Sequence, residues 1–288
     1  MPDPWTIRRV LSWMTADLRA RGIETARLDS ELLVAHALGA NRLALYLDLD
    51  RPLTPDELAS IRSLHLRRRA REPVAYIVGR REFWNRDFEV GPAVLVPRPE
   101  TELLVERALA IVPADSAATV LELCTGSGCV AVSLALERPS LRVVATDVSA
   151  AALEVALRNA SRHRVSGRVE LRRGDLWDAV LENERFALVV ANPPYVAEED
   201  IGSLAPEIRD HEPRAAVSGG PGGLQVIERI AQGARAHLEP GGRLLLEVGA
   251  GQAERVERLL TAEGLVPSGR HRDLSGVERV VEAAAPTL

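Results

Sequence analysis

The amino-acid sequence predicts an α/β protein in which an open, mostly parallel sheet follows a small N-terminal helical bundle and a β-hairpin connector. Residues 1–72 show the apolar spacing of short amphipathic helices. Residues 73–97 alternate in polarity and are rich in aromatic side chains, as the strands of a hairpin are. From residue 98 to residue 288, strands and helices alternate, which is typical of a parallel sheet.

The helical region has recognisable helix starts and ends. Apolar residues recur at helical spacing in residues 7–18 and again in residues 28–38. Thr54 is a candidate N-cap, followed by Pro55 and by two acids in the first turn. The arginine cluster at residues 67–71 suits a helix C-terminus, and we expect a solvated face rather than a phosphate site.

The connector and the sheet follow in order. In the connector, Asn85 and Gly91 are candidate turn residues. We expect strands at residues 119–124, 142–147, 168–175, 186–191 and 242–248, and an antiparallel pair within residues 264–283. The intervening helices are expected at residues 100–112, 128–137, 149–162, 223–238 and 251–263.

Composition and charge exclude several classes of function. The sequence has no run of about 18 apolar residues and no signal-peptide order at its start, so we expect a cytoplasmic protein without a membrane span. The net charge of −5 argues against direct binding of nucleic acid. The absence of lysine excludes Schiff-base chemistry and the lysine-containing phosphate loop. Cys124 and Cys129, without a histidine cluster, do not make a metal site.

A glycine loop and two acids predict a nucleoside site. Residues 124–128, CTGSG, follow a strand and open a helix, so a ligand can approach the backbone closely. Asp147 ends the next strand, where a carboxylate can accept both hydroxyls of a ribose. Asp175 ends the third strand, and with Leu176 and Trp177 it could hold an adenine edge and face. Without lysine or a further phosphate-binding glycine, NAD and ATP fit poorly, and S-adenosylmethionine fits better.

The fourth strand ends in the motif NPPY, residues 192–195. Each proline fixes its own φ and pushes the preceding residue toward an extended conformation. The Asn192 side-chain oxygen and the Pro193 carbonyl then form a stiff pair of acceptors for a planar NH2 group, with the Tyr195 ring beside it. Adenine, cytosine, guanine and carboxamides all carry such a nitrogen, so the motif predicts N-methyl transfer without naming the substrate.

At this point the sequence resembles the bacterial release-factor glutamine methyltransferases, protein-(glutamine-N5) methyltransferases of the HemK/PrmC type. The resemblance covers nearly the whole chain. It rests on RLDSELLVAHALG, on the connector through PRPETELLVE, on the glycine loop, on NPPYV, on HEPRAAVSGGPGGL and on RDLSGVERVV. NPPY alone is shared with adenine methyltransferases, whereas the connector is far more specific.

The resemblance implies a Rossmann-like class I methyltransferase domain at residues 98–288, a substrate-recognition domain at 1–72 and a hairpin at 73–97. It implies S-adenosylmethionine as cofactor, S-adenosylhomocysteine as product, and the Gly-Gly-Gln loop of class I release factors as substrate. The implied cofactor residues are Cys124, Thr125, Gly126, Ser127, Gly128, Asp147, Asp175, Leu176, Trp177 and Asn192. The implied glutamine-binding residues are Phe83, Asn192, Pro193, Pro194 and Tyr195, with Asn192, Pro193 and Tyr195 acting in catalysis.

Two departures and three alternatives remain. The family usually has Asp-Leu-Gly where this chain has Glu122-Leu123-Cys124, so we expect a thiol near the cofactor. Either Leu176 or Trp177 would be the closer adenine contact. The alternative functions are a DNA or RNA amino-methyltransferase, a methyltransferase for glutamine in a ribosomal protein, and a cofactor-binding module without activity.

Overall fold

The computed structural model describes residues 4–287 and divides the chain into two compact units. The first unit comprises the chain up to Arg80 together with residues 205–211, and the second comprises residues 81–204 and 212–288. The chain therefore passes between the units three times, after Arg80, Leu204 and His211. No helix in residues 4–287 is long and apolar enough to cross a membrane.

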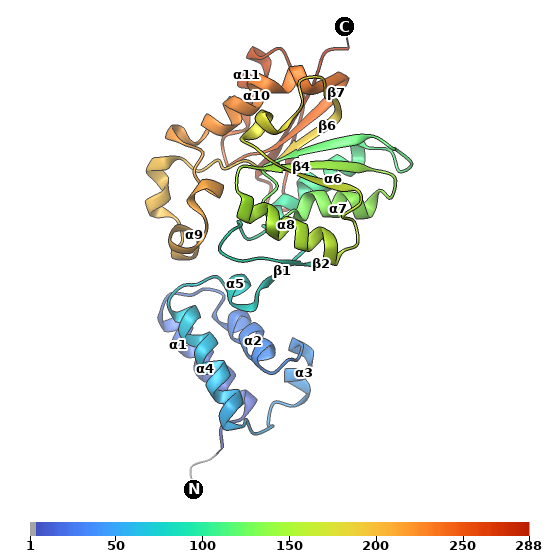
Figure 1. The fold of residues 1–288 in the computed structure, drawn as a ribbon. Coiled ribbons are helices and arrows are strands. Elements are labelled where there is room, and N and C mark those ends of the chain that lie inside the picture. Colours follow the sequence, from blue (N-terminus) through green and yellow to red (C-terminus); the bar gives the residue numbers. More distant parts are fainter. Residues whose placement is uncertain (1–3, 288) are drawn as a thin grey trace. The chain divides into compact units, whose positions relative to one another are not determined.

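The first unit is a bundle of short helices (Figure 1). Its helices are α1 (Ile7–Ala20), α2 (Ala26–Ala37), α3 (Arg42–Leu47), α4 (Pro55–Arg69), α5 (Val74–Val78) and α9 (Pro206–His211). Its core contains Ile7, Val10 and Met14 of α1, which confirms the apolar spacing of that helix. Thr54 caps α4 in a reciprocal capping box with Glu57, as the sequence predicted.

The arginine cluster at the end of α4 differs from the sequence expectation. Arg68 is only 4% exposed, and its guanidinium bonds Asp29 at 2.8 Å and Glu207 of α9 at 2.7 Å. Arg71 also pairs with Glu207, at 2.9 Å. The solvated-face reading was therefore wrong for Arg68, because two carboxylates compensate its burial. These ion pairs hold α9, which comes from late in the sequence, within the helical unit.

The connector is shorter than predicted. Residues 74–78 form α5, which begins after Pro73 and ends at Gly79 in the left-handed conformation. The hairpin is confirmed in β1 (Arg80–Phe83) and β2 (Arg86–Glu89). Its two-residue turn places Trp84 and Asn85 at positive φ, 51° and 54°.

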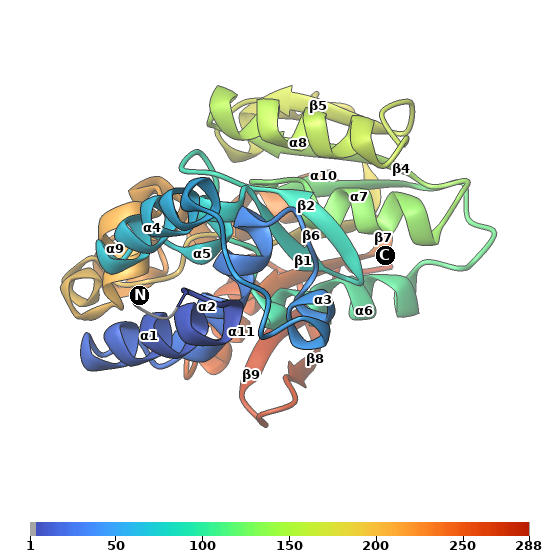
Figure 2. The same ribbon diagram turned by 90° about the horizontal axis from the view of Figure 1, so that it is seen from below.

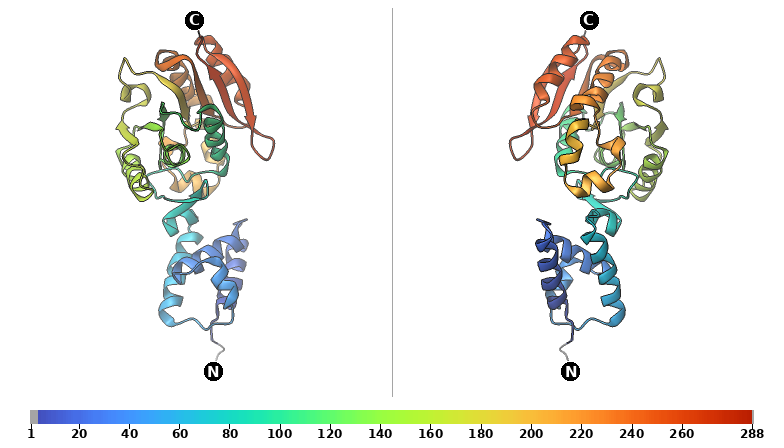
Figure 3. Two further views of the ribbon diagram at one scale, coloured as in Figure 1. Left: turned by 90° about the vertical axis from the view of Figure 1, so that its right-hand side faces the viewer. Right: turned by 90° about the vertical axis from the view of Figure 1, so that its left-hand side faces the viewer.

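The second unit is a three-layer α/β domain around a seven-stranded sheet in the order β5-β4-β3-β6-β7-β9-β8. The strands are β3 (Thr119–Leu123), β4 (Arg142–Asp147), β5 (Val169–Arg173), β6 (Phe186–Ala191), β7 (Leu238–Glu247), β8 (Val266–Arg272) and β9 (Glu278–Ala284). The first five strands are parallel, and β9 is antiparallel to both β7 and β8. Figure 3 shows β8 and β9 (red) closing one side of the sheet. The predicted mostly parallel sheet is confirmed.

Helices cover both faces of this sheet. One core contains residues of α6 (Glu102–Ile111), α7 (Cys129–Glu137) and α8 (Ala150–Arg162), and α8 lies beside β5 (Figure 2). The opposite core contains residues of α10 (Gln225–His237) and α11 (Ala253–Ala262). Short 3-10 turns lie at 99–101, 176–179, 198–203, 214–216 and 221–223.

The strand register brings the predicted motifs to one edge of the sheet. Leu123 at the end of β3 lies opposite Thr146 of β4 and Ala191 of β6. Asp147 at the end of β4 lies opposite Arg173 of β5. The residues that follow these strands therefore gather at their carboxyl ends, where open α/β sheets bind ligands.

Candidate active site

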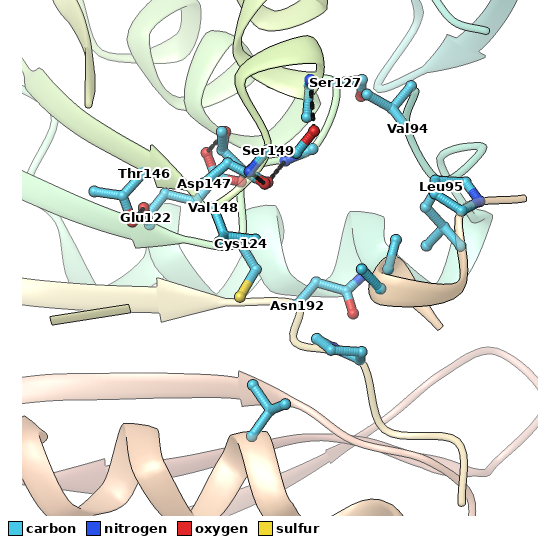
Figure 4. Close-up of a pocket in the computed structure, with 18 of the residues that line it drawn as sticks. Val94, Leu95, Glu122, Cys124, Ser127, Thr146, Asp147, Val148, Ser149 and Asn192 are labelled. Atoms are coloured by element: carbon cyan, nitrogen blue, oxygen red, sulfur yellow. Dashed lines mark hydrogen bonds between the residues drawn. The ribbon is translucent and has the colours of Figure 1, made fainter. Parts of the chain in front are cut away.

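A cavity of about 340 Å³ opens at the carboxyl ends of β3, β4 and β6 (Figure 4). This volume lies at the lower end of the range of small-molecule sites, which is about 300–1,000 Å³. Nine of the predicted site residues line it: Cys124, Thr125, Gly126, Ser127, Asp147, Asp175, Leu176, Asn192 and Pro194. The structure thus brings the glycine loop, both acids and the NPPY asparagine to one cavity.

The glycine loop joins β3 to α7 with two glycines at positive φ, Gly126 at 54° and Gly128 at 77°. Gly128 does not line the cavity; a Cβ there would lie 3.0 Å from the Cβ of Ala156. Because Gly128 has no Cβ, α7 can begin close to Ala156 of α8. Gly126 lines the cavity, and its amide nitrogen donates to Asp147 Oδ2 at 2.9 Å.

Cys124 occupies a conformation that favours glycine, with φ at 60°. Its side chain lines the cavity, as expected from the departure at this position. Burial raises the pKa of the Cys124 thiol well above its ordinary value, and nearby carboxylates add to the effect. The thiol therefore stays protonated at neutral pH and offers an apolar, uncharged surface to a ligand.

Glu122 is a buried carboxyl group beneath the glycine loop. Its Oε2 accepts from the Thr125 hydroxyl at 2.6 Å and from the Ala131 amide at 3.1 Å. Complete burial outweighs these two donors and raises the pKa of Glu122 to about 8. At neutral pH the longer acid is therefore mostly protonated, and it links the loop to the start of α7.

Asp147 presents its carboxylate to the cavity from the end of β4. Oδ2 accepts from the Gly126 amide and Oδ1 from the Ser149 amide, both at 2.9 Å. The helix cap of α8 is Ser149, whose hydroxyl accepts from Ala152, so Asp147 is not the cap itself. Each carboxylate oxygen has a second lone pair, which leaves capacity for two further donors.

The residues after β5 line the cavity with a charged side chain, Asp175, and an apolar one, Leu176. Asp175 Oδ2 accepts from Arg229 at 2.8 Å, and both residues line the cavity with Leu176. Leu176 has φ at 55°, a conformation that turns the chain sharply there. Trp177 is not brought to the cavity. Its indole N–H donates to the Arg229 carbonyl at 3.1 Å, and its ring stacks on His237 with centroids 5.0 Å apart.

The NPPY motif places Asn192 at the cavity and holds it from behind. The Asn192 side-chain nitrogen donates to Thr101 Oγ1 at 3.1 Å, and Thr101 also lines the cavity. Pro194 lines the cavity, whereas Pro193 and Tyr195 are not among its lining residues. The Tyr195 hydroxyl donates to Glu247 Oε1 at 3.4 Å, on the core side of the motif. The expected sandwich of a ligand by the Tyr195 ring is therefore absent from this cavity.

The glycine segment SGGPGG, residues 218–223, packs against the backbone of the NPPY motif. The Gly219 amide donates to the Val196 carbonyl at 2.9 Å, and Val196 donates to Val217 at 3.1 Å. A Cβ at Gly223 would lie 2.4 Å from the Tyr195 carbonyl oxygen. Only glycine permits this approach, so the segment acts as a backing for residues 192–196.

Phe83 was expected among the glutamine-binding residues, and the structure places it away from the cavity. It is 1% exposed and packs against Phe88 in the core, with ring centroids 6.0 Å apart. The side of the cavity is formed by Ala93, Val94, Leu95 and Pro97 and by Pro213, Ala215 and Ala216. Sequence reasoning also missed Thr101, Arg229 and Glu247. Thr101 lies in the PRPET segment that carried the resemblance, whereas Arg229 and Glu247 had no motif to mark them.

Comparisons with known proteins place most of the chain in described families. Residues 9–79 match the family model of the PrmC N-terminal domain, and residues 99–221 match the methyltransferase small domain. A release factor glutamine methyltransferase of Geobacter sulfurreducens is 45% identical over 280 residues, covering 97% of each chain. One from Cereibacter sphaeroides is 47% identical over 269 residues, covering 93% of this chain and 95% of the relative.

A solved structure shares the fold of a large part of the chain. A methyltransferase from Pyrococcus furiosus superposes with a TM-score of 0.53 at 18% identity, covering 71% of this chain and 91% of the other. At that identity the likeness concerns the fold alone.

Proposed function

Because the chain belongs to the family of release factor glutamine methyltransferases, we propose that it transfers a methyl group from S-adenosylmethionine to the side-chain nitrogen N5 of a release-factor glutamine. The glutamine is that of the Gly-Gly-Gln loop of class I release factors, and the modification supports translation termination in the cytoplasm. The observation that carries this proposal is Asn192, whose amide lies at the cavity with its nitrogen held by Thr101.

The residues of the cavity fit S-adenosylmethionine. Asp147 has lone pairs for two ribose hydroxyls, and Leu176 with Asp175 offers an apolar face and an acceptor to adenine. Residues 124–127 expose backbone near the start of a helix, which suits the methionine part. When bound, the cofactor supplies a methyl group on a positively charged sulfur, which is a good leaving group.

The chain's contribution to the reaction is orientation of a weak nucleophile. In a carboxamide the nitrogen lone pair is delocalised, so the amide must be turned and polarised before it reacts. We propose that the Asn192 oxygen and the Pro193 carbonyl accept the two N–H hydrogens and increase the electron density on the nitrogen; Pro193 does not itself line the cavity, but its neighbours Asn192 and Pro194 do. Restraint by successive prolines keeps these acceptors in place. Orientation of this kind can supply about 7–11 kcal/mol of the barrier.

Mass spectrometry of a release factor incubated with the protein and S-adenosylmethionine tests this proposal. We expect the mass of one methyl group on the Gly-Gly-Gln peptide, and fragment ions that place it on the glutamine side chain. Parallel incubations with ribosomal protein, DNA and RNA test the alternative substrates. Methyl transfer to one of these, with none to the release factor, would overturn the proposal. Asn192→Ala should remove most activity while the fold and cofactor binding persist.

A further inference from the structure

A hydrogen-bond path runs from the cavity into the core of the second unit. It begins at Asn192, whose side-chain nitrogen donates to Thr101 Oγ1 at 3.1 Å. The Thr101 hydroxyl, in the turn that precedes α6, also acts on the buried Glu247 carboxyl group at the end of β7, where it opposes the rise in pKa that burial causes, and the Tyr195 hydroxyl donates to Glu247 Oε1 at 3.4 Å. Three elements that are distant in the sequence thus converge behind the asparagine.

The chemistry of the partners fixes the direction of the hydrogen bond between Asn192 and Thr101. A side-chain NH2 group only donates, so Thr101 Oγ1 accepts from Asn192. The single hydroxyl hydrogen of Thr101 is then available to Glu247, whose carboxylate form only accepts and whose pKa burial raises to about 7. A flipped Asn192 would place its oxygen against the Thr101 oxygen and would take the hydroxyl hydrogen away from Glu247. With the nitrogen held by Thr101, the planar amide keeps its oxygen on the opposite side.

Burial makes the path costly to break. Thr101 is 3% exposed and Glu247 is 1% exposed. Hydrogen bonds are stronger in such surroundings, and a group left without a partner is heavily penalised. Among the described residues, Glu247 Oε2 has no hydrogen-bond partner. A buried carboxyl group that is so poorly satisfied weakens the fold, and such groups call for a functional explanation.

We infer that Thr101 and Glu247 are positioning residues, which lock the Asn192 amide with its oxygen toward the substrate. This inference rests on the proposed function, in which that oxygen accepts from the glutamine NH2. Neither residue needs to touch the substrate. Their effect is on the fraction of enzyme in which Asn192 is correctly oriented, so loss of the path lowers kcat more than it changes cofactor binding.

The kinetic test compares variants that differ in one hydroxyl or one charge. Thr101→Val keeps the shape and removes the hydroxyl, and we expect kcat on the release factor to fall about 100-fold. Thr101→Ser restores the hydroxyl and should recover most of that loss. Glu247→Gln can donate as well as accept, and it should lower kcat roughly tenfold. Cofactor affinity, measured by calorimetry, should change less than about threefold in all three.

Matched controls separate positioning from loss of stability. Thr119→Val makes the same substitution at the start of β3, which is the end of the strand away from the cavity. Glu282→Gln removes another buried carboxylate from the same sheet. Both controls should keep the wild-type kcat. If Thr101→Val kept it too, or if Thr101→Ser were as impaired as Thr101→Val, the inference would be overturned.

A spectroscopic measurement decides the inference independently of the substrate. The chain has five asparagines, so selective ¹⁵N labelling gives five side-chain NH2 signals, and Asn192→Ala identifies one of them. We expect Thr101→Val to shift the Asn192 signals and to speed their hydrogen exchange. The signals of Asn159, which donates to the Ser127 carbonyl at 2.8 Å, serve as an internal reference.

The two proposals fail in different ways. Unchanged Asn192 signals in Thr101→Val would sink the positioning role, whatever the wild-type enzyme does to a release factor. A wild-type enzyme that leaves the release factor unmethylated would sink the proposed function, while the signals would still report whether Thr101 holds Asn192.

Discussion

Arg98 donates to the Glu212 carboxylate at 2.6 Å and so joins two segments that form walls of the cavity. Pro97 and Thr101 line the cavity on one side of this ion pair, and Pro213 and Ala215 line it on the other. The Glu212 side chain is 1% exposed, whereas that of Arg98 is 29% exposed. Burial raises the pKa of Glu212, and Arg98 opposes this rise.

Arg98→Ala should therefore destabilise the fold by about 2 kcal/mol, because it leaves a buried acid without its partner. Chemical unfolding measures this loss. The double variant R98A/E212Q should recover part of it, since the unpaired acid is then gone. A double variant less stable than R98A would contradict the pairing argument.

Gly223→Ala should abolish most activity, because the new Cβ would collide with the Tyr195 carbonyl and displace the NPPY motif. The matched control is Gly276→Ala. Its φ of 79° resembles the 74° of Gly223, but nothing lies within 4 Å of its added Cβ. Both variants carry a left-handed strain of about 1–2 kcal/mol, so the larger loss of stability and activity expected for Gly223→Ala reports the collision alone. Equal activity in the two would refute the backing role of residues 218–223.

Glu122 should make the fold less stable as the pH rises. Its folded pKa of about 8 lies above its ordinary value of 4.5, so the folded state holds the proton more tightly. Its contribution is complete below pH 4.5 and is lost as the pH rises through 8. Across this window, the free energy of unfolding of the wild type should fall on the order of 3 kcal/mol more than that of Glu122→Gln. Denaturant titrations at several pH values measure this difference. If the free energies of unfolding of the wild type and of Glu122→Gln changed in parallel with pH, the prediction would be wrong.

Cys124→Gly should stabilise the protein slightly. A non-glycine residue in the left-handed region costs about 1–2 kcal/mol, and the greater freedom of glycine in the unfolded chain returns about 0.5–1 kcal/mol of this. A rise in melting temperature is expected for Cys124→Gly, and none for Cys124→Ala, which keeps the strain. A lower melting temperature for the glycine variant would mean that packing of the thiol outweighs the strain.

Asp147→Ala should weaken binding of S-adenosylhomocysteine by about 10- to 100-fold, because hydrogen bonds to a charged acceptor are lost. Calorimetry with the 2′-deoxyribose analogue sharpens the test. The wild type should bind the analogue more weakly than the parent ligand, whereas the variant should scarcely distinguish the two. A variant that discriminates as well as the wild type would remove Asp147 from ribose binding.

The sequence predicted those parts of the molecule that local chemistry determines. The alternation of strands and helices predicted the parallel sheet. The residues after β3, β4 and β6 predicted the position of the cavity, because the carboxyl ends of parallel strands meet at one edge of the sheet. Thr54 identified the start of α4 because an N-cap needs only its own neighbours.

The remaining parts depend on tertiary contacts. Trp177 follows Leu176 directly, and only the nearby α10 residues explain why its ring turns to His237. The resemblance implied that Phe83 binds the glutamine, yet its ring packs against Phe88 in the core. Glu247 ends a strand like many other acids, and its link to Asn192 through Thr101 exists only once three elements meet.

The assignment of α9 to the helical unit has a consequence for biosynthesis. A ribosome makes residues 1–80 first, yet Glu207, which pairs with Arg68 and Arg71, emerges only after residues 81–204. The amino-terminal unit therefore cannot reach its final form ahead of the rest during translation, although N-terminal-first folding is usual for multidomain chains. Any nascent chain shorter than 207 residues carries Arg68 beside Asp29 without its second carboxylate.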